Sequence, residues 1–83
     1  MDIQKIVLEA AEDILGLEQE DMFDNMDMDL WEEGLLDSIG MASLLASIEE
    51  RIGRKIDIKE MTEAEVISFH TIIEVVERVA AQK

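Results

Sequence analysis

The sequence contains no cysteine and no proline, and it has only one histidine and one tryptophan. Without cysteine there can be no disulfide framework, no thiolate zinc site and no cysteine nucleophile. The lack of a disulfide also fits a reducing compartment. Residues 1–5 lack the basic region and apolar run of a signal peptide, and no apolar run is long enough to cross a bilayer. We therefore expect a cytoplasmic protein without stable membrane insertion.

Basic residues are scarce in the first part of the chain. Residues 1–50 contain 15 aspartates and glutamates against one lysine, whereas residues 51–83 contain six acids and six bases, so the net charge of −14 falls on the first part. This charge repels phosphate backbones, which argues against nucleic-acid binding, and it favours partners with basic surfaces. Self-repulsion also favours a monomer. A length of 83 residues predicts one domain over residues 1–83.

Apolar periodicity predicts a first helix over residues 2–15. Asp2 can cap its start, and Gly16 can end it in the left-handed conformation. From residue 17 to residue 33 the periodicity dissolves among acids, which predicts a long loop with room for a helical turn, pinned across the fold by its apolar residues. The stripe that we expect the first helix to bury consists of Ile3, Ile6, Val7, Ala10 and Ile14.

The second predicted helix covers residues 38–52, and Gly53 is well placed to end it. Gly40 in its first turn is a poor helix residue, less favourable than alanine by about 1 kcal/mol. We expect this glycine to allow close approach of another backbone or of a bound group. The apolar face of the helix consists of Met41, Leu44, Leu45, Ile48 and Ile52.

The last part of the chain predicts a short helix and a longer one. Residues 54–61 alternate as an extended connector, and the capping-box spacing of residues 62–65 predicts a short helix through about Ser68. Residues 71–74 repeat that spacing before a final helix, whose apolar stripe includes Ile72 and Val76. The sequence thus predicts an all-α fold: a small four-helix bundle with a long loop between its first and second helices and a short third helix.

Ser38, at the start of the second predicted helix, supports two interpretations. It can cap the helix, because serine is among the preferred N-cap residues. Alternatively, its hydroxyl can carry a covalently attached group, whose negative charge would be favoured by the free N–H groups and the positive dipole end of the helix. The two roles can coexist, and the residue type alone leaves both open.

Catalytic and metal-binding alternatives find little support in the residues. The elbow of a serine hydrolase needs G-x-S-x-G, and the window from Leu36 to Gly40 lacks the first glycine. A lone histidine such as His70, at a helix start, is usually structural. The aspartates between residues 21 and 29 do not fit the ligand positions of a calcium loop. We therefore expect no catalytic residue and no metal site.

The run Asp37-Ser38-Ile39, at the start of an amphipathic second helix in a small acidic chain, resembles the phosphopantetheine attachment motif of acyl and peptidyl carrier proteins. The resemblance covers essentially the whole chain, and it implies an acyl-carrier-protein type of bundle that is not an enzyme. A phosphopantetheinyl transferase would use coenzyme A and a divalent cation to join 4′-phosphopantetheine to Ser38. The thiol of this arm would hold a cargo as a thioester.

The resemblance also implies roles for the residues around Ser38. Asp37 would help to position the metal and substrate of the modifying transferase. Basic surfaces on a loading ligase and on acceptor enzymes would meet the acidic side chains, mainly for steering, because exposed ion pairs contribute only about 0–1 kcal/mol each. The implied partner-binding residues are Leu36, Ile39, Met41, Ala42, Glu49 and Glu50.

Three details point to the kind of carrier. They are the position of Gly34 before the motif, the Ser38-Ile39-Gly40 start of the helix, and the later runs 48–51 and 56–58. In all three, the sequence resembles the D-alanyl carrier proteins of teichoic acid alanylation. Fatty-acid carriers usually have an acidic or polar residue in place of Gly40 and a glutamate in place of Ser43. The cargo is therefore D-alanine or, alternatively, a fatty or other acyl chain. The alternative from another class is a small acidic protein-interaction module in which Ser38 is only a helix cap.

Overall fold

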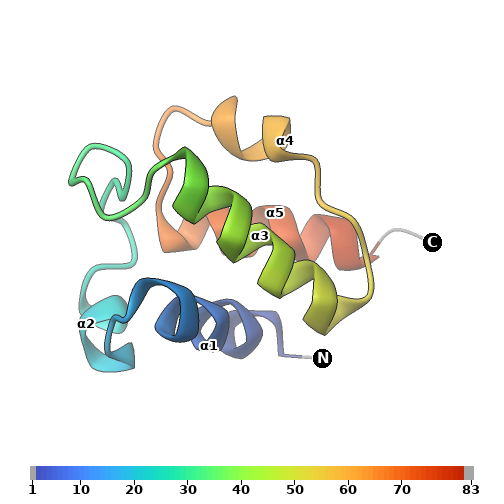
Figure 1. Cartoon of the computed structure of the whole chain (residues 1–83), viewed down its shortest axis with the longest axis horizontal. Helices are drawn as coiled ribbons and strands as arrows, with labels where there is room; N and C mark the ends of the chain where they lie inside the picture. Colours follow the sequence, from blue (N-terminus) through green and yellow to red (C-terminus); the bar gives the residue numbers. More distant parts are fainter. Residues whose placement is uncertain (1, 82–83) are drawn as a thin grey trace.

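The computed structural model describes residues 2–81, and this part of the chain folds into helices and connecting loops without a strand (Figure 1). The helices are α1 (Ile3–Leu15), α2 (Gln19–Asp24), α3 (Ser38–Ile52), α4 (Ile58–Thr62) and α5 (Phe69–Ala81). Helix α1 packs against α2, α3 and α5, whereas α4 packs against α5. The predicted all-α bundle is thus confirmed, with three long helices and two short ones over these residues.

Helix α1 has the predicted ends but a wider buried face than predicted. The Lys5 N–H donates to Asp2 Oδ1 at 3.1 Å, and Gly16 ends the helix with a φ of 69°. Leu8 is buried although it lies outside the predicted stripe, and Ile14 inside that stripe is 40% exposed. The other four residues of the stripe are buried or pack against the core, and the buried face is wider than the stripe because α1 contacts both α3 and α5. The buried residues of α1 are Val7, Leu8, Ala10 and Ala11.

The long first connection is held across the bundle, as the sequence predicts. Its six-residue helix α2 buries Met22, and Leu30 is fully buried further along. The Leu30 N–H donates to the Ile67 carbonyl at 2.8 Å, and the His70 N–H donates to the Met26 carbonyl at 3.1 Å. These backbone bonds join the connection to the residue before Ser68 and to the first turn of α5, so the loop before α3 has a defined place.

Helix α3 matches the prediction at both ends and on its buried face. It begins at Ser38 and ends at Ile52, and Gly53 follows with a φ of 70°, the left-handed conformation that favours glycine. All five residues of the predicted apolar face are buried, namely Met41, Leu44, Leu45, Ile48 and Ile52. The helix therefore turns one face to the core and leaves its opposite face, including Ile39 and Ala42, exposed.

The short helix lies one turn earlier than the sequence predicts. Helix α4 is capped by Asp57, whose Oδ1 accepts from the Lys59 N–H at 2.9 Å. Thr62 is its last residue, and the Thr62 hydroxyl donates to the Lys59 carbonyl at 3.4 Å. The predicted helix over residues 62–68 is therefore wrong. Burial of Met61 from α4 decides the position, because a helix that began at Thr62 would not hold this side chain in the core.

Helix α5 also begins earlier than predicted, because Ser68 and not Thr71 provides the N-terminal cap. The Thr71 N–H donates to Ser68 Oγ at 3.1 Å, and Ser68 is only 3% exposed. The buried residues of α5 are Phe69, Ile72, Ile73, Val75, Val76 and Val79. None of the helices within residues 2–81 combines the length and the apolar character that a membrane crossing requires.

We expect Ser68→Ala to lower the free energy of unfolding by about 0.5–2 kcal/mol, because the first turn of α5 loses its cap. Urea unfolding followed by circular dichroism measures the change. The exposed Ser43 in α3 provides the control, and Ser43→Ala is expected to change the same quantity by less than about 0.5 kcal/mol. Equal effects of the two substitutions would show that Ser68 does not act as a cap.

Candidate functional site

Asp37, and not Ser38, caps helix α3. Asp37 has extended backbone dihedrals, with φ −123° and ψ −174°, and its Oδ1 accepts from the Gly40 N–H at 2.7 Å. The Asp37 carbonyl also accepts from the Met41 N–H at 2.8 Å, which is the first bond of the helical ladder. The interpretation of Ser38 as the cap is therefore wrong, since Ser38 is already the first helical residue.

The Ser38 side chain is exposed at the start of α3, and its hydroxyl makes no hydrogen bond within residues 2–81. This position fits a covalently attached phosphate ester. The N–H groups of the first turn and the positive end of the helix dipole favour a negatively charged group at this place. Because its hydroxyl serves no cap, Ser38 can be modified without loss of a structural hydrogen bond.

A closed turn leads the chain into the site. The Leu30 carbonyl accepts from the N–H groups of Leu35 and Leu36, at 3.0 and 3.1 Å. Gly34 makes this turn possible with a φ of 74°, a backbone conformation that residues with a side chain rarely adopt. Leu36 then enters the core, 2% exposed, directly before Asp37. The direction in which the chain enters α3 is thus set by a buried residue and two backbone bonds.

The expected partner-binding residues divide into two groups. Ile39 is 79% exposed, and Ala42 and Glu50 also lie on the exposed side of α3, so a partner can reach all three. Leu36 and Met41 are 2% and 0% exposed. The expectation that these two residues contact partners does not fit their burial, because both side chains fill the core.

Glu49 has a structural contact of its own. Its Oε2 accepts from the Ile56 N–H at 2.6 Å, and its side chain is half-buried. The bond satisfies a backbone donor in the turn between α3 and α4, next to the buried Ile56. The structure therefore separates Glu49, which supports this turn, from its neighbour Glu50, which is exposed.

Two exposed apolar residues beside the site were not expected. Trp31 and Leu35 are 44% and 39% exposed and lie in the turn that precedes Asp37. From the sequence, the apolar residues of this segment were expected to hold the loop on the core, which the buried Leu30 does. No periodicity separates the buried residues from the exposed ones in so tight a turn, so no sequence signal could have identified them.

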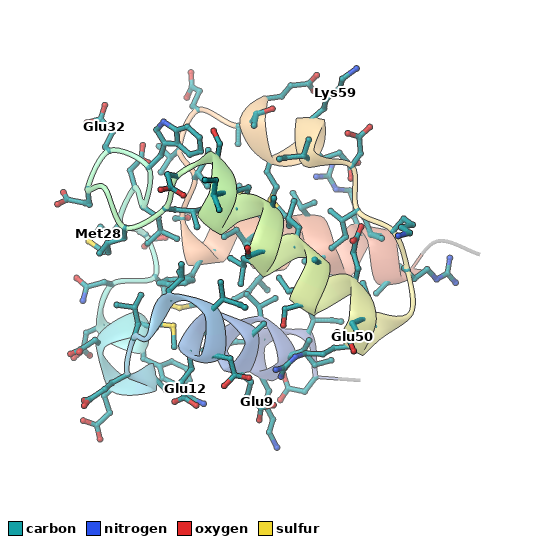
Figure 2. All side chains as sticks on the ribbon, viewed as in Figure 1. Glu9, Glu12, Met28, Glu32, Glu50 and Lys59 are labelled. Atoms are coloured by element: carbon teal, nitrogen blue, oxygen red, sulfur yellow. The ribbon has the colours of Figure 1, made fainter. Side chains whose placement is uncertain are left out.

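Acidic side chains surround much of the bundle. Figure 2 shows Glu9 and Glu12 on α1, and Glu32 in the turn before α3, projecting outward, while Lys59 projects from α4. Arg51 of α3 pairs with α1 instead of adding to a basic surface: its guanidinium lies 2.6 Å from Asp13 Oδ2 and 3.6 Å from Glu9 Oε2. Exposed pairs of this kind contribute about 0–1 kcal/mol each. The helix that carries Ser38 therefore presents Glu50 but little free positive charge.

In the part of the chain that the structure describes, no metal centre accompanies Ser38. Within residues 2–81, no three histidine, aspartate or glutamate side chains gather closely enough to hold a metal ion. A cleft of about 160 Å³ lies along α2 and is lined by Leu17, Asp21, Met22, Asn25, Met28, Leu35 and Phe69. This volume is below the roughly 300–1,000 Å³ of typical small-molecule pockets.

Comparison with known proteins agrees with this geometry. The family model described as "Phosphopantetheine attachment site" matches residues 5–79. This match implies a covalently attached 4′-phosphopantetheine as the cofactor. No solved structure gives a significant match.

The proteins similar to this chain include D-alanyl carrier proteins. The D-alanyl carrier protein 2 of Lactiplantibacillus plantarum is 32% identical over 80 residues, which cover 96% of this chain and 92% of the relative. The D-alanyl carrier protein of Enterococcus faecalis is 40% identical over 60 residues, which cover 72% of this chain and 74% of the relative. The extent of these matches shows that the chain belongs to the family of phosphopantetheine attachment domains, as a carrier protein.

Proposed function

We propose that this chain carries 4′-phosphopantetheine on Ser38 and delivers D-alanine as a thioester on that arm. The observation that supports Ser38 is its exposed side chain at the first position of α3, beside a cap that Asp37 alone provides. The arm supplies the thiol that the cysteine-free chain lacks. The proposal includes one carrier domain, a monomeric state and a cytoplasmic location.

The attachment reaction uses one protein atom directly. Ser38 Oγ attacks the phosphorus of coenzyme A that bears the pantetheine, and a new O–P ester bond forms. The bond from this phosphorus to the bridging oxygen of the diphosphate breaks, so that adenosine 3′,5′-bisphosphate leaves with that oxygen. The hydroxyl proton passes to a base of the phosphopantetheinyl transferase. The Asp37 carboxylate next to Ser38 supplies a negative charge for the divalent cation of the transferase.

The chain itself is proposed to have no catalytic role, because the partner enzymes perform the chemistry. Its partners are the transferase, a ligase that loads the arm and an acceptor enzyme that removes the cargo. Ile39, Ala42 and Glu50 form the proposed docking surface, which begins next to Ser38 and follows the exposed face of α3. Long-range attraction between the acidic surface and basic partner surfaces speeds encounter and permits rapid exchange.

D-alanine is favoured over a fatty acyl chain for two reasons. The relatives at 32% and 40% identity are named as D-alanyl carriers. The core side of α3 also offers a cargo no open cavity, since Met41, Leu44 and Ile48 are 0% exposed in the described part of the chain. A small polar cargo needs no such cavity, whereas a long acyl chain is stabilised by burial of its methylene groups.

The test of carrier function compares the chain with and without its arm. Each form is incubated with ATP, D-alanine and a D-alanine ligase of the carrier type, and the intact mass is measured before and after hydroxylamine treatment. We expect only the arm-bearing form to gain one alanyl residue, and hydroxylamine to remove it, because a thioester is labile to this nucleophile. Equal loading of both forms would show that the cargo is not held on the arm.

Cargo preference is tested on the same arm-bearing protein. We expect loading with D-alanine by the aminoacyl-type ligase to exceed loading with a fatty acid by an acyl-carrier synthetase at equal enzyme concentrations. A conventional acyl carrier protein serves as the control that the synthetase is active. Comparable or faster acylation of this chain by the synthetase would overturn D-alanine as the cargo and leave the arm itself in place.

A further inference from the structure

We propose that Gly40 is a positioning residue for the modification of Ser38, an inference that rests on the proposed attachment at that serine. Gly40 holds the Asp37 carboxylate in one orientation beside the serine. It does so with its N–H group and with the space that its missing side chain leaves. Gly40 itself touches neither coenzyme A nor the reacting oxygen, so its effect passes through Asp37.

The space at Gly40 is occupied chiefly by the Asp37 carboxylate. A Cβ atom at Gly40 would lie 3.1 Å from Asp37 Oδ1, tighter than the 3.4–4 Å of ordinary van der Waals contact. The same atom would lie 3.6 Å from Leu36 Cδ1 and 3.8 Å from Leu15 Cδ2, which are ordinary contacts. A methyl group would therefore fit against the two leucines, and the carboxylate oxygen is the neighbour that would have to move.

Capping alone does not require a glycine at this place. At the start of α1, Asp2 makes the same bond to the residue three positions on, and that residue is Lys5, with a full side chain. The bond to the Lys5 N–H is 3.1 Å long, whereas the bond to the Gly40 N–H is 2.7 Å long. Glycine is also a poor residue inside a helix. Gly40 therefore permits a closer approach of the carboxylate at the expense of helix propensity.

The close approach matters because Asp37 and Ser38 are adjacent and both exposed. With Oδ1 bound to the Gly40 N–H, rotation of the carboxylate is restricted, so Oδ2 is held in one orientation on the residue directly before Ser38. Transfer reactions are sensitive to such relations, since a misplacement of about 1 Å can slow a reaction 100-fold. A shift of a few tenths of an ångström by a methyl group at position 40 is expected to slow transfer about three- to tenfold.

A double-mutant cycle tests the coupling between Gly40 and Asp37. The kcat of a phosphopantetheinyl transferase at saturating carrier is measured for the wild type, Gly40→Ala, Asp37→Ser and the double variant, with urea unfolding of each. Serine at position 37 keeps a capping oxygen but removes the carboxylate. We expect Gly40→Ala to lower kcat about three- to tenfold in the wild-type background and to change it by less than about twofold in the Asp37→Ser background. The control Ser43→Ala changes the same helix away from Asp37 and is expected to retain the wild-type kcat.

A spectroscopic measurement gives the same test without the enzyme. The amide proton shift of residue 40, corrected for residue type, is expected to move upfield in Gly40→Ala as its bond to Asp37 lengthens. Three results would each overturn the role of Gly40: a wild-type kcat for Gly40→Ala, a decrease in kcat by the same factor in both backgrounds, or an unchanged amide proton shift. Absence of arm addition to the wild-type chain is a different result, because it would overturn attachment at Ser38 and the role of Gly40 with it.

Discussion

Leu44→Ala is expected to lower the free energy of unfolding by about 2–5 kcal/mol, because it removes a side chain that is 0% exposed from the centre of α3. The loss combines the transfer free energy of the deleted methyl groups with the free energy of the cavity that remains. Small domains have total stabilities of about 5–15 kcal/mol, so this single substitution removes a large share. Urea unfolding monitored by circular dichroism measures the change.

Ile39→Ala is the matched control, since Ile39 lies in the same helix but is 79% exposed. Its effect on the free energy of unfolding is expected to be below about 0.5 kcal/mol. Ile39→Ala is instead expected to lower turnover by a partner enzyme, because Ile39 belongs to the proposed docking surface. Equal destabilisation by the two substitutions would contradict the assignment of Leu44 to the core face and Ile39 to the partner face.

The second large contrast concerns the two adjacent residues at the start of α3. Ser38→Ala is expected to abolish addition of the arm while changing the free energy of unfolding by less than about 0.5 kcal/mol. Asp37→Ala is expected to lower that free energy by about 0.5–2 kcal/mol, because the Gly40 N–H loses its partner at 2.7 Å. The stability effect and the loss of modification thus belong to different residues.

Chemical denaturation of the unmodified forms of both variants checks this contrast. Unmodified protein is necessary because an arm present only on the wild type would alter the comparison. A larger loss of stability for Ser38→Ala than for Asp37→Ala would restore Ser38 as the cap. It would also remove the argument that its hydroxyl is available without structural loss.

A helix could be predicted from the sequence where its apolar spacing and its capping residues indicated the same position. Helix α3 was predicted correctly because its apolar spacing and Gly53 at its end indicate the same helix. Around α4, the capping-box spacing that begins at Thr62 competed with the cap at Asp57. Burial of Ile56 and Met61 selected Asp57, and this tertiary contribution has no signature in the spacing. The buried face of α1 is wider than the predicted stripe for a similar reason, since α1 packs against two helices.

At the site, the sequence identified the motif but did not show which of its residues caps the helix and which is free for modification. Asp37 and Ser38 are both good capping residues in adjacent positions, and only the backbone conformation of Asp37 shows which oxygen reaches Gly40. The apolar periodicity of α3 placed Met41 in the core, and it was a better guide than the partner role that the resemblance implied. The bond from the Ile56 N–H to Glu49 depends on the return of the chain after α3, which spacing along one helix cannot show.

Ser38 is proposed to carry the arm. The intact mass of the chain after incubation with coenzyme A and a broad-specificity phosphopantetheinyl transferase tests this claim. The wild type is expected to gain the mass of one phosphopantetheine, and fragmentation is expected to place this mass on Ser38. Ser43→Ala is expected to gain the same mass, and Ser38→Ala none. A wild-type chain that gains no mass, or a Ser38→Ala chain that gains as much as the wild type, would contradict the claim.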